Sequence, residues 1–167
     1  MPRFDGPSML AVLAEHEVDY IVIGGFAAVA QGSPLLTNDV DIVPSPEPDN
    51  MARLSTALKA MRAKVRAEGV EPLPFDHDAV SLADARIWNL TTRYGDLDIT
   101  LRPAGTQGYD DLRRDAVAVT IRGVPVRLAS LGDIVRSKEA AGRDKDRRAL
   151  PVLRELVSRQ LRSRHPR

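Results

Sequence analysis

Residues 22–42 decide the fold, and their sequence is VIGGFAAVAQGSPLLTNDVDI. An apolar run ends at Gly24 and Gly25, an alanine-rich stretch compatible with a short helix follows, and the segment closes on an acid–valine–acid stretch. Alternation of acids with β-branched residues is typical of a strand. Because residues i and i+2 of a strand project from the same face, we expect Asp39 and Asp41 to lie together, with Cα atoms roughly 7 Å apart.

The two neighbouring aspartates predict a cation site. Two like charges side by side are unfavourable unless a cation lies between them. Mg²⁺ prefers hard oxygen ligands and usually also takes oxygens from a substrate phosphate. Gly24 and Gly25 would let the backbone approach that phosphate, with N–H groups at the start of the following helix pointing at it.

The glycine pair and the aspartates resemble a known signature. The Gly24–Gly25 pair followed by Thr37–Asp41 is similar to the nucleotidyltransferase superfamily pattern, a G-G or G-S turn, a helix and D-x-D on the next strand. The palm of that superfamily resembles that of DNA polymerase β. With residues 130–138 and 143–146, the chain resembles the minimal nucleotidyltransferases of bacterial toxin–antitoxin systems, the AbiEii and MenT kind. The resemblance spans about residues 18–156.

The resemblance implies a fold and an activity. The expected fold is α/β (α+β), a small mixed sheet flanked by helices and followed by C-terminal helices. The expected activity is Mg²⁺- or Mn²⁺-dependent transfer of a nucleotide from an NTP to an RNA acceptor, the 3′ end of tRNA, causing growth arrest. A separate antitoxin protein would neutralise it. Two alternatives stay open: nucleotidyl transfer to a small molecule (an antibiotic, for example) or to a protein, and non-catalytic binding of a nucleotide or protein.

Charge distribution bears on the acceptor. The net charge of +1 combines a basic segment, residues 136–167 with 11 Lys/Arg and 4 Asp/Glu, and an acidic body, residues 1–135 with 13 and 19. Such asymmetry suggests an anionic partner such as RNA, the competing explanation being a solvated helix. The basic segment therefore argues against a small-molecule acceptor, as does the lack of room for a large acceptor domain in 167 residues.

A third carboxylate is expected on a neighbouring strand, where paired Cβ atoms lie about 5 Å apart. Residues 86–93 and 96–102 are predicted as two strands of a hairpin, and Asp96 and Asp98 share one face of the second. Asp98 is preferred because it lies mid-strand, whereas Asp96 is nearer the turn. The predicted metal ligands are Asp39, Asp41 and Asp98.

Lys138 lies on the apolar stripe of a helix predicted from Ser130 to Gly142. A lysine in such a stripe either extends its amine to water or meets an anion, so we predict that it points into the nucleotide site and joins the three aspartates as a catalytic residue. By the resemblance, Lys138 holds nucleotide phosphates, and Asp146 matches a further acidic position. The alternative for Asp146 is a charge that favours a helix N-terminus. The residues expected to contact the NTP are Gly24, Gly25, Thr37, Lys138 and Asp146.

Length and composition predict the organisation. A chain of 167 residues is expected to form one domain over residues 1–167, with a core of about 18–128 and C-terminal helices of about 130–163. The lack of cysteine excludes disulfides and thiolate metal sites. We find no signal peptide and no apolar stretch near the ~20 residues that span a bilayer, and therefore expect a soluble cytoplasmic protein without a membrane partner.

The remaining elements follow from periodicity and turn residues. Helices are predicted at residues 7–15, 26–30, 48–64 and 144–163, and strands at 19–23, 39–43, 116–121 and 124–128. The apolar stripe of the third helix includes Val65. The segment 66–84 is left unassigned, and its Asp76-His77-Asp78 stretch is expected to form a loop or a helix cap rather than a metal site.

Overall fold

The structure, a computed structural model, describes residues 3–166. Its strands are β1 (Tyr20–Ile23), β2 (Asp39–Pro44), β3 (Lys64–Val65), β4 (Ile87–Thr92), β5 (Gly95–Thr100), β6 (Val117–Ile121) and β7 (Val124–Leu128). Its helices are α1 (Gly6–Glu15), α2 (Gly24–Ala30), α3 (Pro48–Ala60), α4 (Ala79–Asp84), α5 (Tyr109–Arg113), α6 (Leu131–Ala141) and α7 (Asp144–Arg164).

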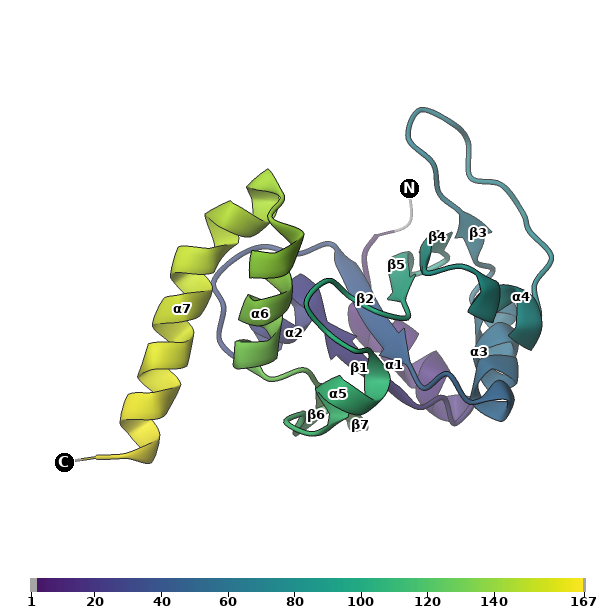
Figure 1. Ribbon diagram of the computed structural model, residues 1–167. Coiled ribbons are helices and arrows are strands. Elements are labelled where there is room, and N and C mark those ends of the chain that lie inside the picture. The colour runs from purple at the N-terminus through teal and green to yellow at the C-terminus, as the bar shows by residue number, and fades with distance from the viewer. Residues whose placement is uncertain (1–2, 167) are drawn as a thin grey trace.

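The strands form one mixed sheet in the order β3-β4-β5-β2-β1-β7-β6 (Figure 1). The β2–β5 and β1–β7 pairs are parallel, and the other neighbours are antiparallel. The small mixed sheet flanked by helices agrees with the expected architecture, and β2 occupies its centre. The expectation that residues 1–167 form a single domain stays a prediction.

Alternation along the central strands gives the sheet one apolar and one acidic face. Val40 and Ile42 on β2, like Leu97 and Ile99 on β5, are at most 1% exposed and belong to one buried cluster. Helices α1 and α3 contribute methionine and leucine side chains to the same cluster. Truncating such a side chain, as in Leu97→Ala, is expected to cost about 2–5 kcal/mol. The acidic residues between them project from the opposite face, where the sheet lines a cleft.

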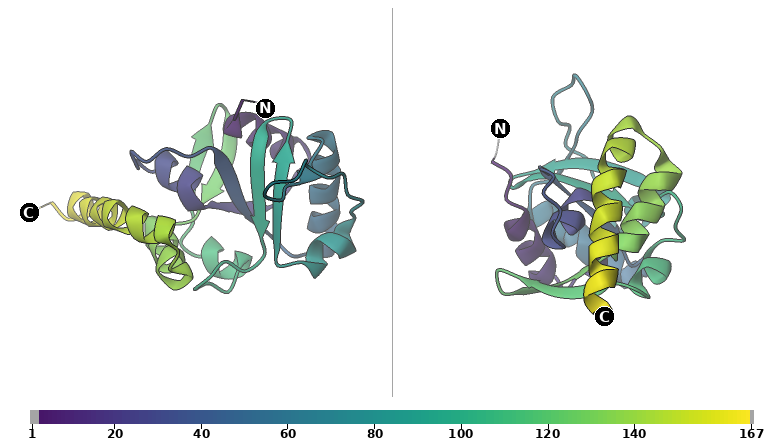
Figure 2. Two further views of the ribbon diagram at one scale, coloured as in Figure 1. Left: turned by 90° about the horizontal axis from the view of Figure 1, so that it is seen from above. Right: turned by 90° about the vertical axis from the view of Figure 1, so that its left-hand side faces the viewer.

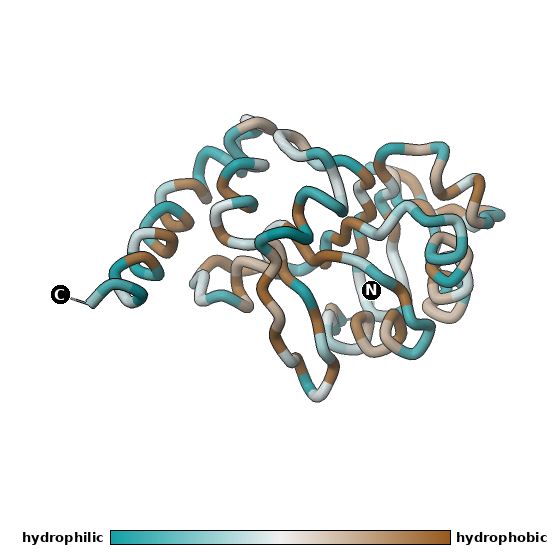
Figure 3. The backbone as a smooth tube through the Cα atoms, turned by 60° about the horizontal axis from the view of Figure 1, so that its bottom comes forward, coloured by the Kyte–Doolittle hydropathy of each residue, from teal (hydrophilic) through white to brown (hydrophobic). Residues whose placement is uncertain are grey.

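Helices α6 and α7 pack against each other, and the C-terminal end of α7 extends away from the sheet (Figure 2). Ser130 caps α6 by accepting a hydrogen bond from Asp133 N at 3.0 Å, and Gly142 ends it in a left-handed conformation, φ 63°, as predicted. Pro151 lies within α7 without ending it. Hydrophilic and hydrophobic segments alternate along α7 (Figure 3), as on an amphipathic helix. Within residues 3–166 no helix has both the length and the apolarity needed to cross a bilayer.

The predicted end of the third helix is wrong. We expected residues 48–64, whereas α3 ends at Ala60. Arg62 has a φ of 55°, a left-handed conformation that stops the helix and turns the chain into β3. Val65, expected on the helix stripe, is therefore a strand residue.

Short elements account for part of what the sequence left unassigned, and residues 66–78 form an irregular segment. Strand β3 and helix α4 lie in or next to the segment 66–84, and α5 follows β5. Asp78 caps α4, accepting a hydrogen bond from Ser81 N at 2.8 Å, which confirms the predicted cap. The buried ring of His77 bonds the Ser55 hydroxyl at 2.7 Å and packs into the fold.

Arg62 yields a stability prediction. A non-glycine residue in the left-handed region is strained, whereas glycine is not. Arg62→Gly should therefore raise the free energy of unfolding by about 0.5–1 kcal/mol after allowance for the greater entropy of glycine in the unfolded chain. Urea denaturation measures the change. Arg62→Ala is the control, because it removes the same side chain but keeps the strain; an equal gain in this variant would show that backbone conformation is not the cause.

Candidate active site

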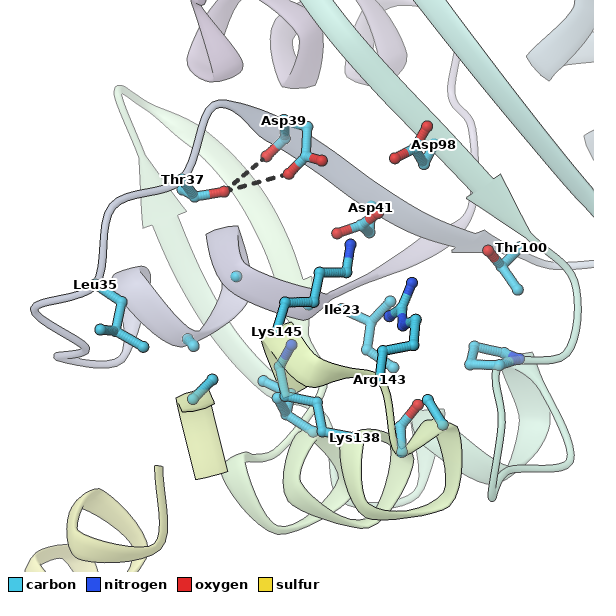
Figure 4. Close-up of a pocket in the computed structure, with 18 of the residues that line it drawn as sticks. Ile23, Leu35, Thr37, Asp39, Asp41, Asp98, Thr100, Lys138, Arg143 and Lys145 are labelled. Carbon is cyan, nitrogen blue, oxygen red and sulfur yellow. Dashed lines mark hydrogen bonds between the residues drawn. The ribbon is translucent and has the colours of Figure 1, made fainter. Parts of the chain in front are cut away.

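Strand β2 holds two carboxylates on one face, and β5 adds a third. The β2–β5 register pairs Asp39 with Asp96 and Asp41 with Asp98, so that all four acids project from the same side of the sheet. The carboxylates of Asp39, Asp41 and Asp98 converge, each offering an oxygen within 4.8 Å of the other two, and all three are half-buried (Figure 4). The donor set, three hard oxygens from separate carboxylates, fits a divalent cation such as Mg²⁺.

Asp98 joins this cluster and Asp96 does not. Asp96 pairs with Arg66, which also donates to Asp98 Oδ1 at 2.8 Å. Arg66 lines the same cleft and was missed at the sequence level. Arg66 lies in the segment that the sequence left unassigned. Only the pairing of β3 with β4 places it on the same face of the sheet as the aspartates.

The glycine pair allows the chain to pass close to the acids. Gly24 has a φ of 75°, and a Cβ at this position would overlap Asp41 Oδ2. A Cβ at Gly25 would lie 3.1 Å from the Thr37 hydroxyl oxygen. That hydroxyl donates toward the main-chain and side-chain oxygens of Asp39, both at 3.3 Å. Any side chain at residue 24 would therefore displace a carboxylate, and Thr37 helps to fix the position of another.

Four cations from α6, α7 and the turn between them face the acidic floor. Lys138, Arg143, Lys145 and Arg148 all line the cleft. In Figure 4 the amine of Lys145 reaches toward Asp41 more closely than that of Lys138 does. Lys145 lies in the segment 143–146 that carries the resemblance, where only Asp146 was expected to contribute to the site. Periodicity could not identify Lys145, because its direction depends on how α7 folds back on α6.

Asp146 lies behind the cleft rather than in it. Its side chain is completely buried, and it accepts hydrogen bonds from Arg143 Nε at 2.7 Å and Lys138 Nζ at 3.3 Å. Burial opposes its ionisation, but these two cations outweigh that effect and hold the pKa of the carboxyl below its usual value. Direct contact with a nucleotide, expected from the resemblance, does not fit this position. Asp146 instead fixes the two cations that reach the cleft and also caps α7, the alternative expected for it.

The role predicted for Lys138 in a nucleotide site stays a prediction. Its side chain is 17% exposed and lines the cleft. We expected the amine to meet an anion in the nucleotide site, and its partner in the structure is Asp146. Since the amine also has donors to spare, it can still meet an anion.

The crowding of carboxylates changes the acidity of the site. Burial, together with the charges of Asp39 and Asp98, raises the pKa of Asp41 to about 7, although Lys145 and Lys138 act in the opposite direction. Burial also raises the pKa of Asp98, and Arg66 offsets part of that rise. The nearby lysines and Arg66 therefore do not fully neutralise the three carboxylates. The remaining negative charge favours binding of a cation.

The cleft has a volume of about 1170 Å³ and lies between the acidic face of the sheet and helices α6 and α7. Of the residues predicted to form the site, the structure brings all but Asp146 to its wall. Apolar side chains of the loop before β2 and of α7, among them Leu35 and Leu153, line another part. Such a cleft offers anionic, cationic and apolar surfaces to one ligand.

Comparison with known proteins identifies the fold. No family model matches the chain. No curated protein matches it. A candidate nucleotidyltransferase of Thermotoga maritima matches with a TM-score of 0.54 and 19% identity, over 86% of this chain and 86% of that chain. The antibiotic-resistance factor ANT(2'')-Ia matches with a TM-score of 0.55 and 18% identity, over 93% of this chain and 88% of that chain. The expected nucleotidyltransferase fold is thereby confirmed.

Asp41 predicts how stability depends on pH. Its pKa, about 3.9 in an unfolded chain, is about 7 in the fold, so protonated Asp41 stabilises the protein at low pH and this contribution is lost as pH rises toward 7. Asp41→Asn should remove that loss. In EDTA at pH 8 it should be more stable than the wild type by about 2–4 kcal/mol, and the difference should fall to about 1 kcal/mol or less near pH 4.5.

Thermal unfolding at the two pH values measures this effect. Asp144→Asn is the matched control, because the Asp144 side chain is 87% exposed and lies outside the cluster. A stability gain for Asp41→Asn that is equal at both pH values would contradict ionisation of a buried Asp41 beside Asp39 and Asp98 as its source.

Proposed function

We propose that the protein transfers a nucleotidyl group from an NTP to an acceptor hydroxyl. The observation that carries the proposal is the convergence of Asp39, Asp41 and Asp98 within 4.8 Å on the floor of a cleft lined by five cationic side chains. Phosphoryl-type transfer depends on positioning and on charge neutralisation rather than on covalent chemistry by the protein. The nucleotidyltransferase fold of the chain supports the proposal.

The roles of the residues follow from their places. Asp39 and Asp41 would hold the ion bound to the triphosphate, and Asp98 would lie on the acceptor side. When bound, Mg²⁺ supplies neutralisation of phosphate charge and makes the acceptor hydroxyl more acidic. Lys138 and Lys145 would hold phosphate oxygens beside the backbone of Gly24 and Gly25, which also lines the cleft. The acceptor hydroxyl gives up its proton to solvent and its oxygen bonds to the α-phosphorus, while the bond from that phosphorus to the bridging oxygen breaks and pyrophosphate leaves.

Labelled NTPs test the activity. The protein, Mg²⁺ and each labelled NTP are incubated with total tRNA, and the products are separated on a gel. Asp41→Ala should lower transfer by at least about 100-fold, since it removes charge stabilisation that acts during the reaction. Asp144→Asn, a change at an exposed acid outside the cluster, should retain activity. Transfer by Asp41→Ala at the wild-type rate would exclude this site.

We further propose that the acceptor is RNA, the 3′ end of tRNA, and that the protein is a toxin of the AbiEii and MenT kind, neutralised by a separate antitoxin. The supporting observation is the exposed basic surface of α7, next to the cleft. Arg154, Arg159 and Arg162 are all more than half exposed there. A tRNA acceptor would also place the reaction in the cytoplasm.

The salt dependence of RNA binding tests this surface. Each phosphate neutralised by a side chain contributes about 0.7 to the slope of log affinity against log salt for single-stranded RNA. Neutralising Arg154, Arg159 and Arg162 to glutamine should lower the slope by about 1–2 and weaken binding. The control neutralises the exposed cations Lys59, Arg62 and Lys64, which lie at the far end of the sheet. An equal change from both sets would indicate non-specific attraction.

A small-molecule acceptor is the second candidate. The likeness to ANT(2'')-Ia favours it, and because the match covers most of that chain as well, the size of this protein does not argue against it. The lack of room expected from the sequence is therefore not a valid objection. Adding hydroxyl-bearing antibiotics to the same assay separates the candidates: label in RNA supports the first, and label in the antibiotic alone supports the second.

A further inference from the structure

One row of residues crosses the acidic face of the sheet from its edge to β2. Arg66 extends the β3–β4 pairing, because its N–H donates to the Asn89 carbonyl at 2.9 Å. Asn89 pairs with Asp98, and Asp98 pairs with Asp41. Paired residues of neighbouring strands share a face, so Arg66 is on the same side as the carboxylate cluster, about 10 Å from Asp98 at two strand spacings.

The side chain of Arg66 spans that interval and joins two acids. Its Nη2 donates to Asp98 Oδ1 at 2.8 Å, and its Nη1 pairs with Asp96 Oδ2. Asp98 belongs to the convergent cluster. Asp96 lies two residues earlier on β5, on the same face, and is outside the cluster. The arginine therefore connects a proposed metal ligand to a second acid that is not one.

We propose that Arg66 is a built-in counter-cation of Asp98, and that this arginine must release Asp98 and keep only its pair with Asp96 before a divalent cation can bind at the third carboxylate. The inference rests on the proposed function, because it takes Asp39, Asp41 and Asp98 as the metal site. Arg66 is a positioning residue in this account, and Asp96 is its alternative partner. The pair sets how readily the acceptor side of the site is loaded.

Competition for one carboxylate gives the mechanism. An Asp98 that is already paired with a guanidinium has to break that interaction to bind a metal ion, so the ion pair lowers the affinity for the metal. The side chain of Arg66 is only 32% exposed, so leaving its guanidinium without a partner would be unfavourable. Asp96 supplies a partner within reach, so that a movement of one side chain is sufficient.

Mn²⁺ binding without nucleotide, measured by calorimetry, tests the proposal on the full-length protein. Arg66→Gln should bind Mn²⁺ about three- to tenfold more tightly than the wild type, because Asp98 has lost its competing partner. Asp96→Asn should bind about threefold more weakly, because Arg66 then has Asp98 as its only acid. The double variant should match Arg66→Gln within about twofold, since Asp96 acts through the arginine.

The controls separate the possible failures. Arg93→Gln removes an exposed cation of the β4–β5 turn, outside the cleft, and should leave Mn²⁺ affinity within about twofold of the wild type. Near-UV circular dichroism checks that each variant is folded. Unchanged or weaker binding by Arg66→Gln overturns the inference, as does a double variant as weak as Asp96→Asn, which would make Asp96 a direct ligand. Absence of Mn²⁺ binding by the wild type itself would instead overturn the proposed metal site.

Discussion

Repulsion among three carboxylates that the sheet forces together is the constraint on which the site depends. The parallel register of β2 and β5 fixes Asp39, Asp41 and Asp98 on one face, and the apolar residues between them keep that register by packing into the core. A slip of one residue would put the acids in the core and the aliphatic residues in the cleft. Hydrophobic burial therefore stabilises an arrangement of charges that is unfavourable by itself.

Cations from distant parts of the chain offset this charge. Arg66 approaches from the edge of the sheet, and Lys138, Arg143 and Lys145 approach from α6, α7 and their connection. Completely buried Asp146 holds two of these cations in place, so the second layer of the site is itself an ion network. Breaking such a buried network by removing one partner leaves a charge uncompensated, which typically costs about 3–5 kcal/mol. Fold stability and site geometry are thus linked through Asp146.

The sequence predicted the carboxylates because their spacing is local. Asp39 and Asp41 are two residues apart on one strand, and Asp98 lies mid-strand in a hairpin with clear alternation, so the period of the strand fixes their direction. Arg66 and Lys145 were missed because their positions depend on long-range packing, the first on a two-residue strand and the second on the return of α7. The resemblance led us to expect Asp146 in the site. A sequence motif shows which residues are near Asp146 in the chain, but it does not show where the side chain points.

The central claim, that Asp39, Asp41 and Asp98 bind the metal ion of a nucleotide complex, is tested most directly by crystallography. Crystals grown with Mn²⁺ and a non-hydrolysable NTP analogue would be measured at the manganese absorption edge. The account predicts an anomalous peak among the three carboxylates, with metal–oxygen distances of about 2.0–2.3 Å and the triphosphate beside Gly24 and Gly25. A nucleotide bound elsewhere, or a cluster without metal in the presence of bound nucleotide, would contradict it.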